Sequence, residues 1–274
     1  MREKKSKGYG GGFVPRKHWG QHFLVDSHIV QKILRACDLK PYDKVLEIGP
    51  GSGVLTKEIA RRVEQVIAIE KDPILCSRLR GDLSTPNTTI IEADFLKYDF
   101  ERLPKPLKVI GNLPYYISTP ILVRLLEHHE NFTEGFFTLQ WEFGKRLVAG
   151  ISTKDYSALS CLVQFYAEPE FLFKIKKTCF RPVPKIDSCF MKLQFLPDCR
   201  FEVKDRTFFF NLIREAFQQR RKKILNSLCG SAAKETIQDV LASLKISTEK
   251  RAGDLTLKNY ADIANALLQK LNNQ

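Results

Sequence analysis

The sequence predicts an α/β fold, in which one mostly parallel sheet of seven strands is followed by a small all-helical region. Short β-branched runs alternate with helical stretches between residues 44 and 139. Two further strand-like runs follow at 171–175 and 189–195, and beyond residue 200 apolar residues recur mainly at helical spacing. Because strand–helix–strand units join parallel neighbours, the alternation indicates right-handed crossovers and a largely parallel sheet.

The first expected element is a helix around residues 29–34, which Asp26 or Ser27 can cap. A strand at 44–48 (KVLEI) is flanked by turn residues and is expected to be buried. The following elements are expected, in order, as a helix at 56–62, a strand at 66–70, a helix at 73–83, strands at 89–92 and 107–110, a helix at 120–128 and a strand at 135–139. The runs at 171–175 and 189–195 are predicted to form an antiparallel pair that closes the sheet. Residues 244–246 are a weak candidate for one more strand.

The charge of the chain is concentrated at its two ends. Lys and Arg number 44 against 31 Asp and Glu among 274 residues, a formal net charge of +13, so a polyanion is the expected partner. Residues 1–18 hold six basic residues against one acidic one, and residues 200–274 hold fourteen against eight. We expect a flexible basic arm at 1–17, an α/β domain at 18–199 and a basic helical domain at 200–274.

Several classes of protein are excluded by composition. No stretch approaches the roughly 20 consecutive apolar residues of a membrane-spanning helix, so no membrane partner is expected. The N-terminus runs into glycines instead of the apolar core of a secretory signal, which predicts a cytoplasmic protein. The seven cysteines are scattered and never spaced two apart, so we expect reduced thiols, with no disulfide and no metal site.

A glycine-rich turn follows the first predicted strand, in the segment Glu47-Ile48-Gly49-Pro50-Gly51-Ser52-Gly53. Glycines there let the backbone approach a ligand closely, and the next helix offers its N-terminus. The dinucleotide pattern G-x-G-x-x-G fails, because Thr56 or Val54 stands where its last glycine is required. The phosphate-binding P-loop pattern is also missing. An acid before G-x-G-x-G instead resembles the first motif of S-adenosylmethionine-dependent methyltransferases.

Two more acids end the second and third predicted strands. Glu70 stands about twenty residues beyond the glycines, where a carboxylate can accept both hydroxyls of a ribose. Asp94 follows the third strand and can accept an adenine amino group, with Phe95 beside it for packing. A carboxylate at a strand end is usually only solvated, but three acids in register with a glycine loop predict a nucleoside site.

The segment Asn112-Leu113-Pro114-Tyr115 follows the fourth predicted strand and matches the [Asn/Asp/Ser]-x-Pro-[aromatic] motif of amino-group methyltransferases. An adenine amino group is a poor nucleophile, because its lone pair is delocalised into the ring. Two acceptors bonded to its hydrogens and a ring stacked on the base assist its attack. We expect the Asn112 side-chain oxygen and the Pro114 carbonyl to be those acceptors, and Tyr115 to be the stacking face. The alternative is a loop without a catalytic role that contains a proline and two tyrosines.

From about residue 16 to 265 the chain resembles the bacterial small-subunit ribosomal RNA adenine dimethyltransferases. Gly20-Gln21-His22-Phe23-Leu24 is similar to the N-terminal cofactor motif of that family, with His22 where Asn is common. The resemblance implies a Rossmann-like class I methyltransferase domain that uses S-adenosyl-L-methionine and releases S-adenosyl-L-homocysteine. The cofactor residues that it implies are Gln21, His22, Leu24, Glu47, Gly49, Gly51, Glu70, Asp94, Phe95 and Asn112.

The family resemblance also extends to the expected RNA contacts. The segment 180–185 (FRPVPK) is similar to a family loop whose Phe, here Phe180, faces the target base from the side opposite Tyr115. Residues 217–228 and 251–255 follow the family pattern in the helical region. Within them the run Arg220-Arg221-Lys222-Lys223 is expected to contact RNA phosphates, although a solvated charged face is the alternative.

The activity implied is dimethylation of the N6 amino groups of two adjacent adenosines in the 3′-terminal hairpin of 16S rRNA. The implied partner is a precursor of the 30S subunit, bound by a monomer with a role in subunit biogenesis. We expect direct in-line methyl transfer without a covalent enzyme intermediate, because no nucleophile lies in the motifs. Two alternatives remain open: a 23S rRNA adenine methyltransferase of the antibiotic-resistance type, and a non-catalytic ribosome-assembly factor with the same fold.

Overall fold

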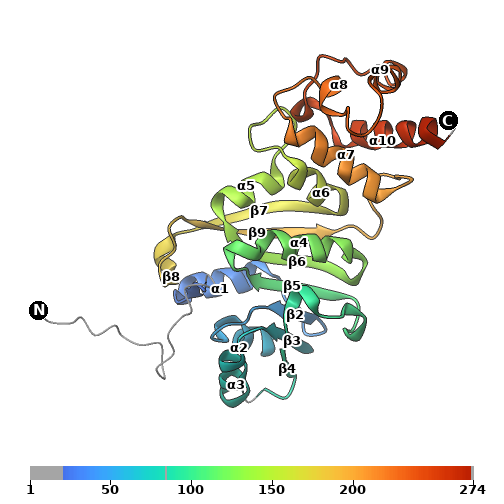
Figure 1. Cartoon of the computed structure of the whole chain (residues 1–274). Helices are drawn as coiled ribbons and strands as arrows, with labels where there is room; N and C mark the ends of the chain where they lie inside the picture. The colour runs from blue at the N-terminus through green and yellow to red at the C-terminus, as the bar shows by residue number, and fades with distance from the viewer. Residues whose placement is uncertain (1–20, 84, 273–274) are drawn as a thin grey trace, which may run out of the picture.

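The computed structural model describes residues 21–83 and 85–272, and its centre is a seven-stranded sheet. The strand order is β4-β3-β2-β5-β6-β9-β7, so the first strand of the sheet, β2, lies in its interior and the chain crosses over to both sides of it. Figure 1 shows the strands side by side through the molecule, with the C-terminal helices beyond the β7 edge. The predicted basic arm at 1–17 lies outside the described residues.

All seven predicted strands of this sheet are confirmed. They are β2 (Lys44–Ile48), β3 (Gln65–Glu70), β4 (Thr88–Glu92), β5 (Leu107–Asn112), β6 (Phe132–Gln140), β7 (Ala167–Ile175) and β9 (Ser188–Phe195). The pairs among β2, β3, β4, β5 and β6 are parallel, whereas β9 lies antiparallel to both β6 and β7. The expected antiparallel closing pair is therefore present, with β9 inserted between β6 and β7.

Helices cover both faces of the sheet. They are α1 (Ser27–Ala36), α2 (Val54–Ala60), α3 (Pro73–Asp82), α4 (Ser118–Glu127), α5 (Trp141–Val148) and α6 (Ala158–Tyr166) before residue 200, and α7 (Arg206–Gln218), α8 (Ile224–Ser227), α9 (Lys234–Ser243) and α10 (Leu257–Asn272) after it. Asp26, one of the two expected caps, accepts from the backbone N–H groups of His28 and Ile29 and so begins α1. Pro73 stands in the first turn of α3, where its missing N–H costs no helical hydrogen bond.

The predicted strand at 244–246 is wrong. The segment instead ends α9, because Lys245 takes a left-handed backbone with φ of 56°. The N–H of Ile246 then reaches back to the carbonyl of Leu241 at 2.8 Å. This is how helices commonly end, and Ile246 remains buried at the turn.

The structure also contains a second sheet of two short strands, which was not predicted from the sequence. It pairs β1 (Phe23–Leu24) with β8 (Phe180–Arg181) in antiparallel register. Each strand has only two residues, and more than 150 residues separate them in the chain, so no local pattern marks either one. The pairing brings the predicted N-terminal motif against the 180–185 loop.

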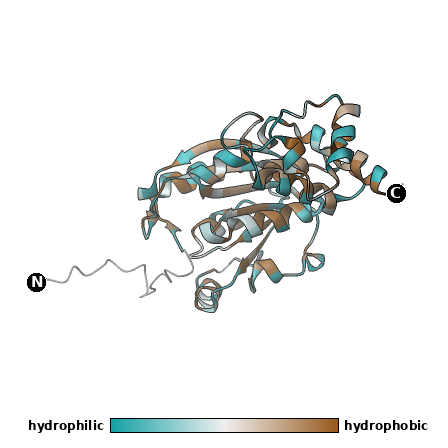
Figure 2. Ribbon diagram, turned by 45° about the horizontal axis from the view of Figure 1, so that its top comes forward, coloured by the Kyte–Doolittle hydropathy of each residue, from teal (hydrophilic) through white to brown (hydrophobic). Residues whose placement is uncertain are grey.

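Two apolar clusters lie on opposite faces of the sheet. One packs α1 and α2 on residues such as Val45 and Val66, and the other packs α4 and α6 on residues such as Leu46 and Ile67. Neighbouring residues of one strand are thus buried on both faces, as expected for a covered parallel sheet. The second cluster continues without a break into α7, α9 and α10. Figure 2 shows the strands mostly brown (hydrophobic), with teal (hydrophilic) segments on the outer helices.

Candidate active site

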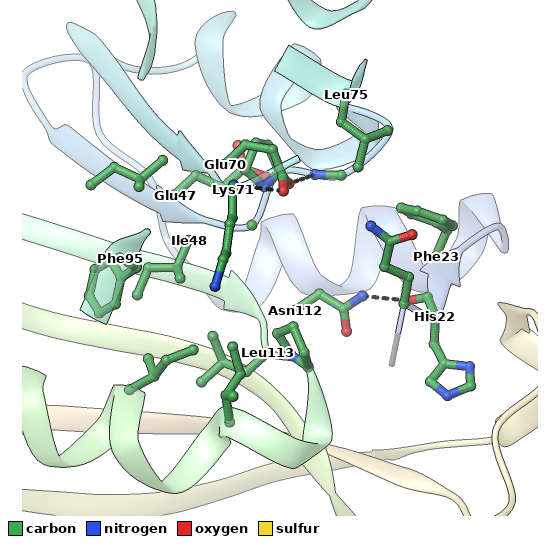
Figure 3. Close-up of a pocket in the computed structure, with 18 of the residues that line it drawn as sticks. His22, Phe23, Glu47, Ile48, Glu70, Lys71, Leu75, Phe95, Asn112 and Leu113 are labelled. Carbon is green, nitrogen blue, oxygen red and sulfur yellow. Dashed lines mark hydrogen bonds between the residues drawn. The ribbon is translucent and has the colours of Figure 1, made fainter. Parts of the chain in front are cut away.

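A pocket opens where the carboxyl ends of β2, β3 and β5 meet (Figure 3), as expected at the ligand edge of an open α/β sheet. Thirteen of the predicted site residues line it: Gln21, His22, Leu24, Glu47, Gly49, Gly51, Glu70, Asp94, Phe95, Asn112, Leu113, Pro114 and Tyr115. Segments that are more than 90 residues apart in the chain therefore contribute to one cavity.

The glycine turn between β2 and α2 forms the floor of the pocket. Gly49, Gly51 and Gly53 all have positive φ, between 59° and 75°, which other residues rarely adopt. A Cβ on Gly51 would stand 2.8 Å from the ring of Phe23, so no larger residue fits there. A Cβ on Gly49 would meet nothing within 4 Å, so the backbone there is open to a ligand.

Glu70, at the end of β3, is held by backbone donors. One carboxylate oxygen accepts from Gly51 N at 3.2 Å, and the other accepts from Lys71 N and Asp72 N, both at 2.9 Å. Burial raises the pKa of Glu70, and these three hydrogen bonds oppose the rise. The carboxylate thus ties the end of β3 to the glycine turn and is fixed in one orientation.

Glu47 lies beneath the turn and is only 2% exposed. Burial raises its pKa to about 7, and the nearby Glu70 carboxylate adds to the rise. Its Oε2 atom is buried without a hydrogen-bond partner among the described residues. A buried acceptor with no partner beside an open glycine turn fits a polar group of a bound ligand.

Asp94 stands at the start of the short helix η2 (Phe95–Lys97) and lies on the wall of the pocket. One of its oxygens accepts from Leu96 N, and the other forms a 2.8 Å ion pair with Lys71. Burial alone would raise the pKa of Asp94, but Lys71 and the Leu96 N–H lower it overall. Phe95 is buried next to it, so its ring can close the apolar side of a nucleoside site.

Asn112 ends β5 with its amide group in a defined orientation. Its Nδ2 atom donates to the backbone carbonyl of His22 at 2.8 Å, as the dashed line in Figure 3 marks. The side-chain oxygen therefore points away from His22 and is available as an acceptor. The His22 ring donates from Nδ1 to the Pro182 carbonyl at 2.7 Å, because a carbonyl only accepts, and Nδ1 therefore carries the proton. The same ring stacks on Tyr115, with centroids 5.4 Å apart.

The expectation that the Pro114 carbonyl is a free acceptor is corrected by the structure. That carbonyl already accepts from Ser118 Oγ at 3.0 Å and from Ile117 N at 3.1 Å, so both of its lone pairs are engaged. The neighbouring Leu113 carbonyl accepts no backbone or side-chain hydrogen bond from the described residues. Tyr115 bonds through its hydroxyl to Ser188 Oγ at 2.7 Å, which fixes the plane of its ring.

Phe180 does not lie where the family resemblance placed it. Its side chain is 0% exposed, and it packs in the apolar cluster under α1, together with Ile33 and Phe190. It is not among the residues that line the pocket. Because no part of the ring is exposed in this conformation, Phe180 anchors its loop to the apolar cluster.

The basic run at 220–223 is only partly available to a ligand. The guanidinium of Arg220 donates to the carbonyls of Lys154 and Thr153 at 2.6 and 2.7 Å, and Lys223 pairs with Glu249 at 2.7 Å. Arg221 and Lys222 are exposed, and no ion pair engages them within the part of the chain that the structure describes. Arg220 therefore links the helical region to the loop at Thr153 and Lys154. The sequence alone did not distinguish Arg220 from its basic neighbours.

Among the pocket residues that sequence reasoning missed, two contact predicted site residues. Lys71 pairs with Asp94 across the mouth of the pocket, and Phe23 packs on the glycine turn. The position of Lys71 directly after Glu70 was a usable signal, because it shares the strand end that positions the acid. Phe23 gave no such signal, since its place depends on the long-range pairing of β1 with β8.

Neither a cluster of metal ligands nor a membrane-spanning helix occurs among the described residues. No three or more His, Cys, Asp or Glu side chains among them gather as metal ligands would. Likewise, none of the described helices has the length and apolar character needed to cross a bilayer.

Comparison with known proteins gives consistent matches. The family description "Ribosomal RNA adenine dimethylase" matches residues 12–269. The "Ribosomal RNA small subunit methyltransferase A" of Moorella thermoacetica is 43% identical over 270 residues, covering 93% of each chain. The protein of that name from Pelotomaculum thermopropionicum is 40% identical and covers 94% of this chain and 92% of its own.

Among solved structures, a dimethyladenosine transferase from Plasmodium falciparum aligns with a TM-score of 0.78 at 28% identity. The alignment covers 92% of this chain and 98% of that one. The 23S rRNA methyltransferase ErmE aligns with a TM-score of 0.69 at 29% identity, over 90% of this chain and 100% of that one. The family match spans most of the chain and the relatives exceed one-third identity, so this chain belongs to the ribosomal RNA adenine dimethylase family.

Proposed function

We propose that this chain dimethylates the N6 amino groups of two adjacent adenosines near the 3′ end of 16S rRNA. The observation that carries the proposal is the orientation of Asn112, whose amide donates to His22 and leaves its oxygen free in the pocket beside Tyr115. The relatives named for the small ribosomal subunit are 36–43% identical over at least 90% of this chain. ErmE, which acts on 23S rRNA, is 29% identical, so the 16S substrate is favoured over the 23S substrate.

S-adenosyl-L-methionine supplies an electrophilic methyl group on a cationic sulfur, and S-adenosyl-L-homocysteine is the product. The fit of the pocket rests on the open backbone at Gly49 and the partnerless oxygen of Glu47. In this proposal the Glu70 carboxylate accepts the ribose hydroxyls and Asp94 accepts the adenine amino group of the cofactor. Gln21, His22, Leu24, Gly51, Phe95 and Asn112 complete the lining around it.

The target adenine is held by acceptors and a stacking ring. The Asn112 oxygen and the Leu113 carbonyl each accept one hydrogen of the target amino group, the latter in place of the engaged Pro114 carbonyl. Tyr115 stacks on the base, in a plane set by its hydroxyl bond to Ser188. These contacts raise electron density on the amine and aim its lone pair, and the proton leaves after the nitrogen becomes cationic.

The substrate class is ribosomal RNA in a precursor of the 30S subunit, and the enzyme acts as a monomer without a metal. Such a substrate places the protein in the cytoplasm, where subunits are assembled. The basic arm at 1–17, the helical domain at 200–274 and the exposed Arg221 and Lys222 then contribute phosphate contacts around a catalytic domain at 18–199.

The test replaces Asn112 by Ala and measures methyl transfer to 30S particles, with mass spectrometry of the adenosines in 16S and 23S rRNA. We expect turnover to fall at least about 100-fold, because an acceptor for the amine is lost, while the melting temperature stays near that of the unmodified chain. The matched control is Asn211→Ala, on the exposed side of α7.

Three outcomes contradict the proposal. Unchanged turnover in Asn112→Ala removes the assigned role of this side chain. Methylation confined to 23S rRNA assigns the rival substrate. No methylation of either RNA by the unmodified chain favours the non-catalytic assembly factor.

A further inference from the structure

The loop that follows β7 carries a local excess of positive charge within a nearly neutral part of the chain. Residues 174–187 hold five Lys and Arg against one Asp. Four of these cations, Lys176, Lys177, Arg181 and Lys185, have exposed side chains, and we call them the basic rim. The fifth, Lys174, pairs with Asp187 at 2.9 Å, so it neutralises the only acid of the segment.

The basic rim borders the candidate active site. The pairing of Phe23 with Arg181 and Leu24 with Phe180 joins the loop to the N-terminal motif that lines the pocket. The Pro182 carbonyl bonds to the His22 ring at 2.7 Å, and that ring stacks on Tyr115. Figure 1 shows the segment around β8 projecting beyond the sheet next to α1.

The loop is held in place by contacts that leave its cations outside. Phe180 and Pro184 are buried, and Cys179 accepts a backbone bond from Val25 at 2.9 Å. Asp187 closes the base of the loop by accepting from Lys177 N at 3.0 Å. The guanidinium of Arg181 donates to two carbonyls of its own loop. An ordered loop loses little conformational entropy when it binds a ligand.

Three of the four rim cations have no side-chain partner among the described residues, against two of the four cations in the 220–223 run, Arg221 and Lys222. Among the described residues, no carboxylate forms an ion pair with Lys176, Lys177 or Lys185. Arg220 and Lys223, by contrast, are engaged within the protein. Two exposed apolar side chains, Val183 at 48% and Ile186 at 38%, lie between and beside the cations of the rim. Free cations interspersed with apolar groups suit an RNA backbone, whose phosphates alternate with sugars.

We propose that the basic rim binds the phosphates of the nucleotides that flank the target adenosine, and so holds the strand while the base enters the pocket. This inference rests on the proposed function, because it takes the RNA bound at the pocket as its ligand. Lys176, Lys177 and Lys185 contact phosphates, Val183 and Ile186 contact sugars, and Arg181 chiefly secures the loop. The rim therefore adds a phosphate site in the catalytic part of the chain, separate from the two basic ends.

The experiment replaces Lys176, Lys177 and Lys185 together by Ala in the full chain. Its matched control replaces Lys40, Lys44 and Lys105 by Ala, which removes the same charge from the opposite edge of the sheet, where the strands begin. Binding to 30S particles and to a protein-free RNA with the 3′-terminal hairpin sequence of 16S rRNA is measured from about 50 to about 200 mM salt. Methylation by the unmodified chain is measured on the same particles.

We expect the rim variant to bind both probes at least about tenfold more weakly at the lowest salt, and its plot of log affinity against log salt to be less steep by about 2. Its affinity for S-adenosylmethionine and its melting temperature should match those of the control variant. An unchanged slope, or an equal change in the control variant, overturns the inference. Weaker binding to particles alone also overturns it, in favour of a ribosomal-protein contact. If the unmodified chain methylates no rRNA, the proposed function fails instead.

Discussion

The cofactor half of the pocket and its base half are built in different ways. The cofactor half, from Glu47 to Phe95, uses strand ends and turns that lie close together in the sequence. The base half is built from the Asn112–Tyr115 segment, and the N-terminal motif, which the cofactor half shares, joins it to the loop around Phe180 through pairings across 70 to 160 residues. Local geometry therefore decides where the first half lies, whereas tertiary packing decides the second.

The elements that depend on local geometry could be predicted from the sequence, whereas the long-range pairings could not. Glycines at 49 and 51 are required by a positive φ at those positions, and the acids follow β-branched strands, so the cofactor half could be predicted from nearby residues. The sheet was predictable for the same reason, since each of its strands is a local apolar run. The pairing of β1 with β8 could not be predicted, because two-residue strands have no periodicity.

Three side chains show why residue type alone does not assign a role. Phe180 belongs to β8, which pairs with the pocket-lining strand β1, but its side chain is buried in the core. The Pro114 carbonyl is engaged by Ser118, which lies one helical turn further on. Arg220 looked like its basic neighbours, yet its guanidinium bonds to a loop 66 residues away. In each case the partner that the fold supplies, and not the residue type, sets the role.

The largest effect is expected from Phe180→Ala, which tests whether this ring belongs to the core or to the base half. Because the ring is fully buried, we expect the free energy of unfolding to fall by about 3–5 kcal/mol, as measured by denaturant unfolding. Phe180→Leu should lose less than about 1.5 kcal/mol, since it keeps most of the apolar volume. Full stability of Phe180→Ala together with a loss of RNA binding would show that the ring faces the base, against the structure.

A second prediction concerns the cofactor half and its pH dependence. The pKa of Glu47 rises from 4.5 to about 7 on folding, so its ionisation opposes the folded state. This cost is missing below about pH 4.5, grows as pH rises, and reaches about 3 kcal/mol above pH 7. The difference in unfolding free energy between Glu47→Gln and the unmodified chain should therefore shift by about 3 kcal/mol in favour of the variant when the pH is raised from about 4.5 to about 8. Urea unfolding at the two pH values measures it. The control, at the exposed Glu170, is Glu170→Gln, and an equal gain there contradicts the assignment.

The smallest effect is expected from Tyr115→Phe, which tests whether the hydroxyl in the base half only positions the ring. The change removes the hydroxyl bonded to Ser188 but keeps the stacking face. We expect a loss of about 1 kcal/mol in stability and a fall in turnover of less than about tenfold. Tyr42→Phe, at a ring that is 72% exposed and outside the pocket lining, is the control and should change neither quantity. A loss of turnover far beyond tenfold would mean that the hydroxyl itself acts on the substrate.

The apolar cluster that runs from the sheet into the C-terminal helices bears on how the chain folds. Phe165 of α6 packs on Phe209 of α7, with ring centroids 5.1 Å apart, and Tyr156 packs edge-on against Phe217. The change in sequence texture near residue 200 therefore does not coincide with a break in the hydrophobic core. The same apolar cluster includes Phe95 and Leu113 in the wall of the pocket, so packed side chains connect the C-terminal helices to the pocket. We therefore expect the two parts to unfold together as one cooperative unit.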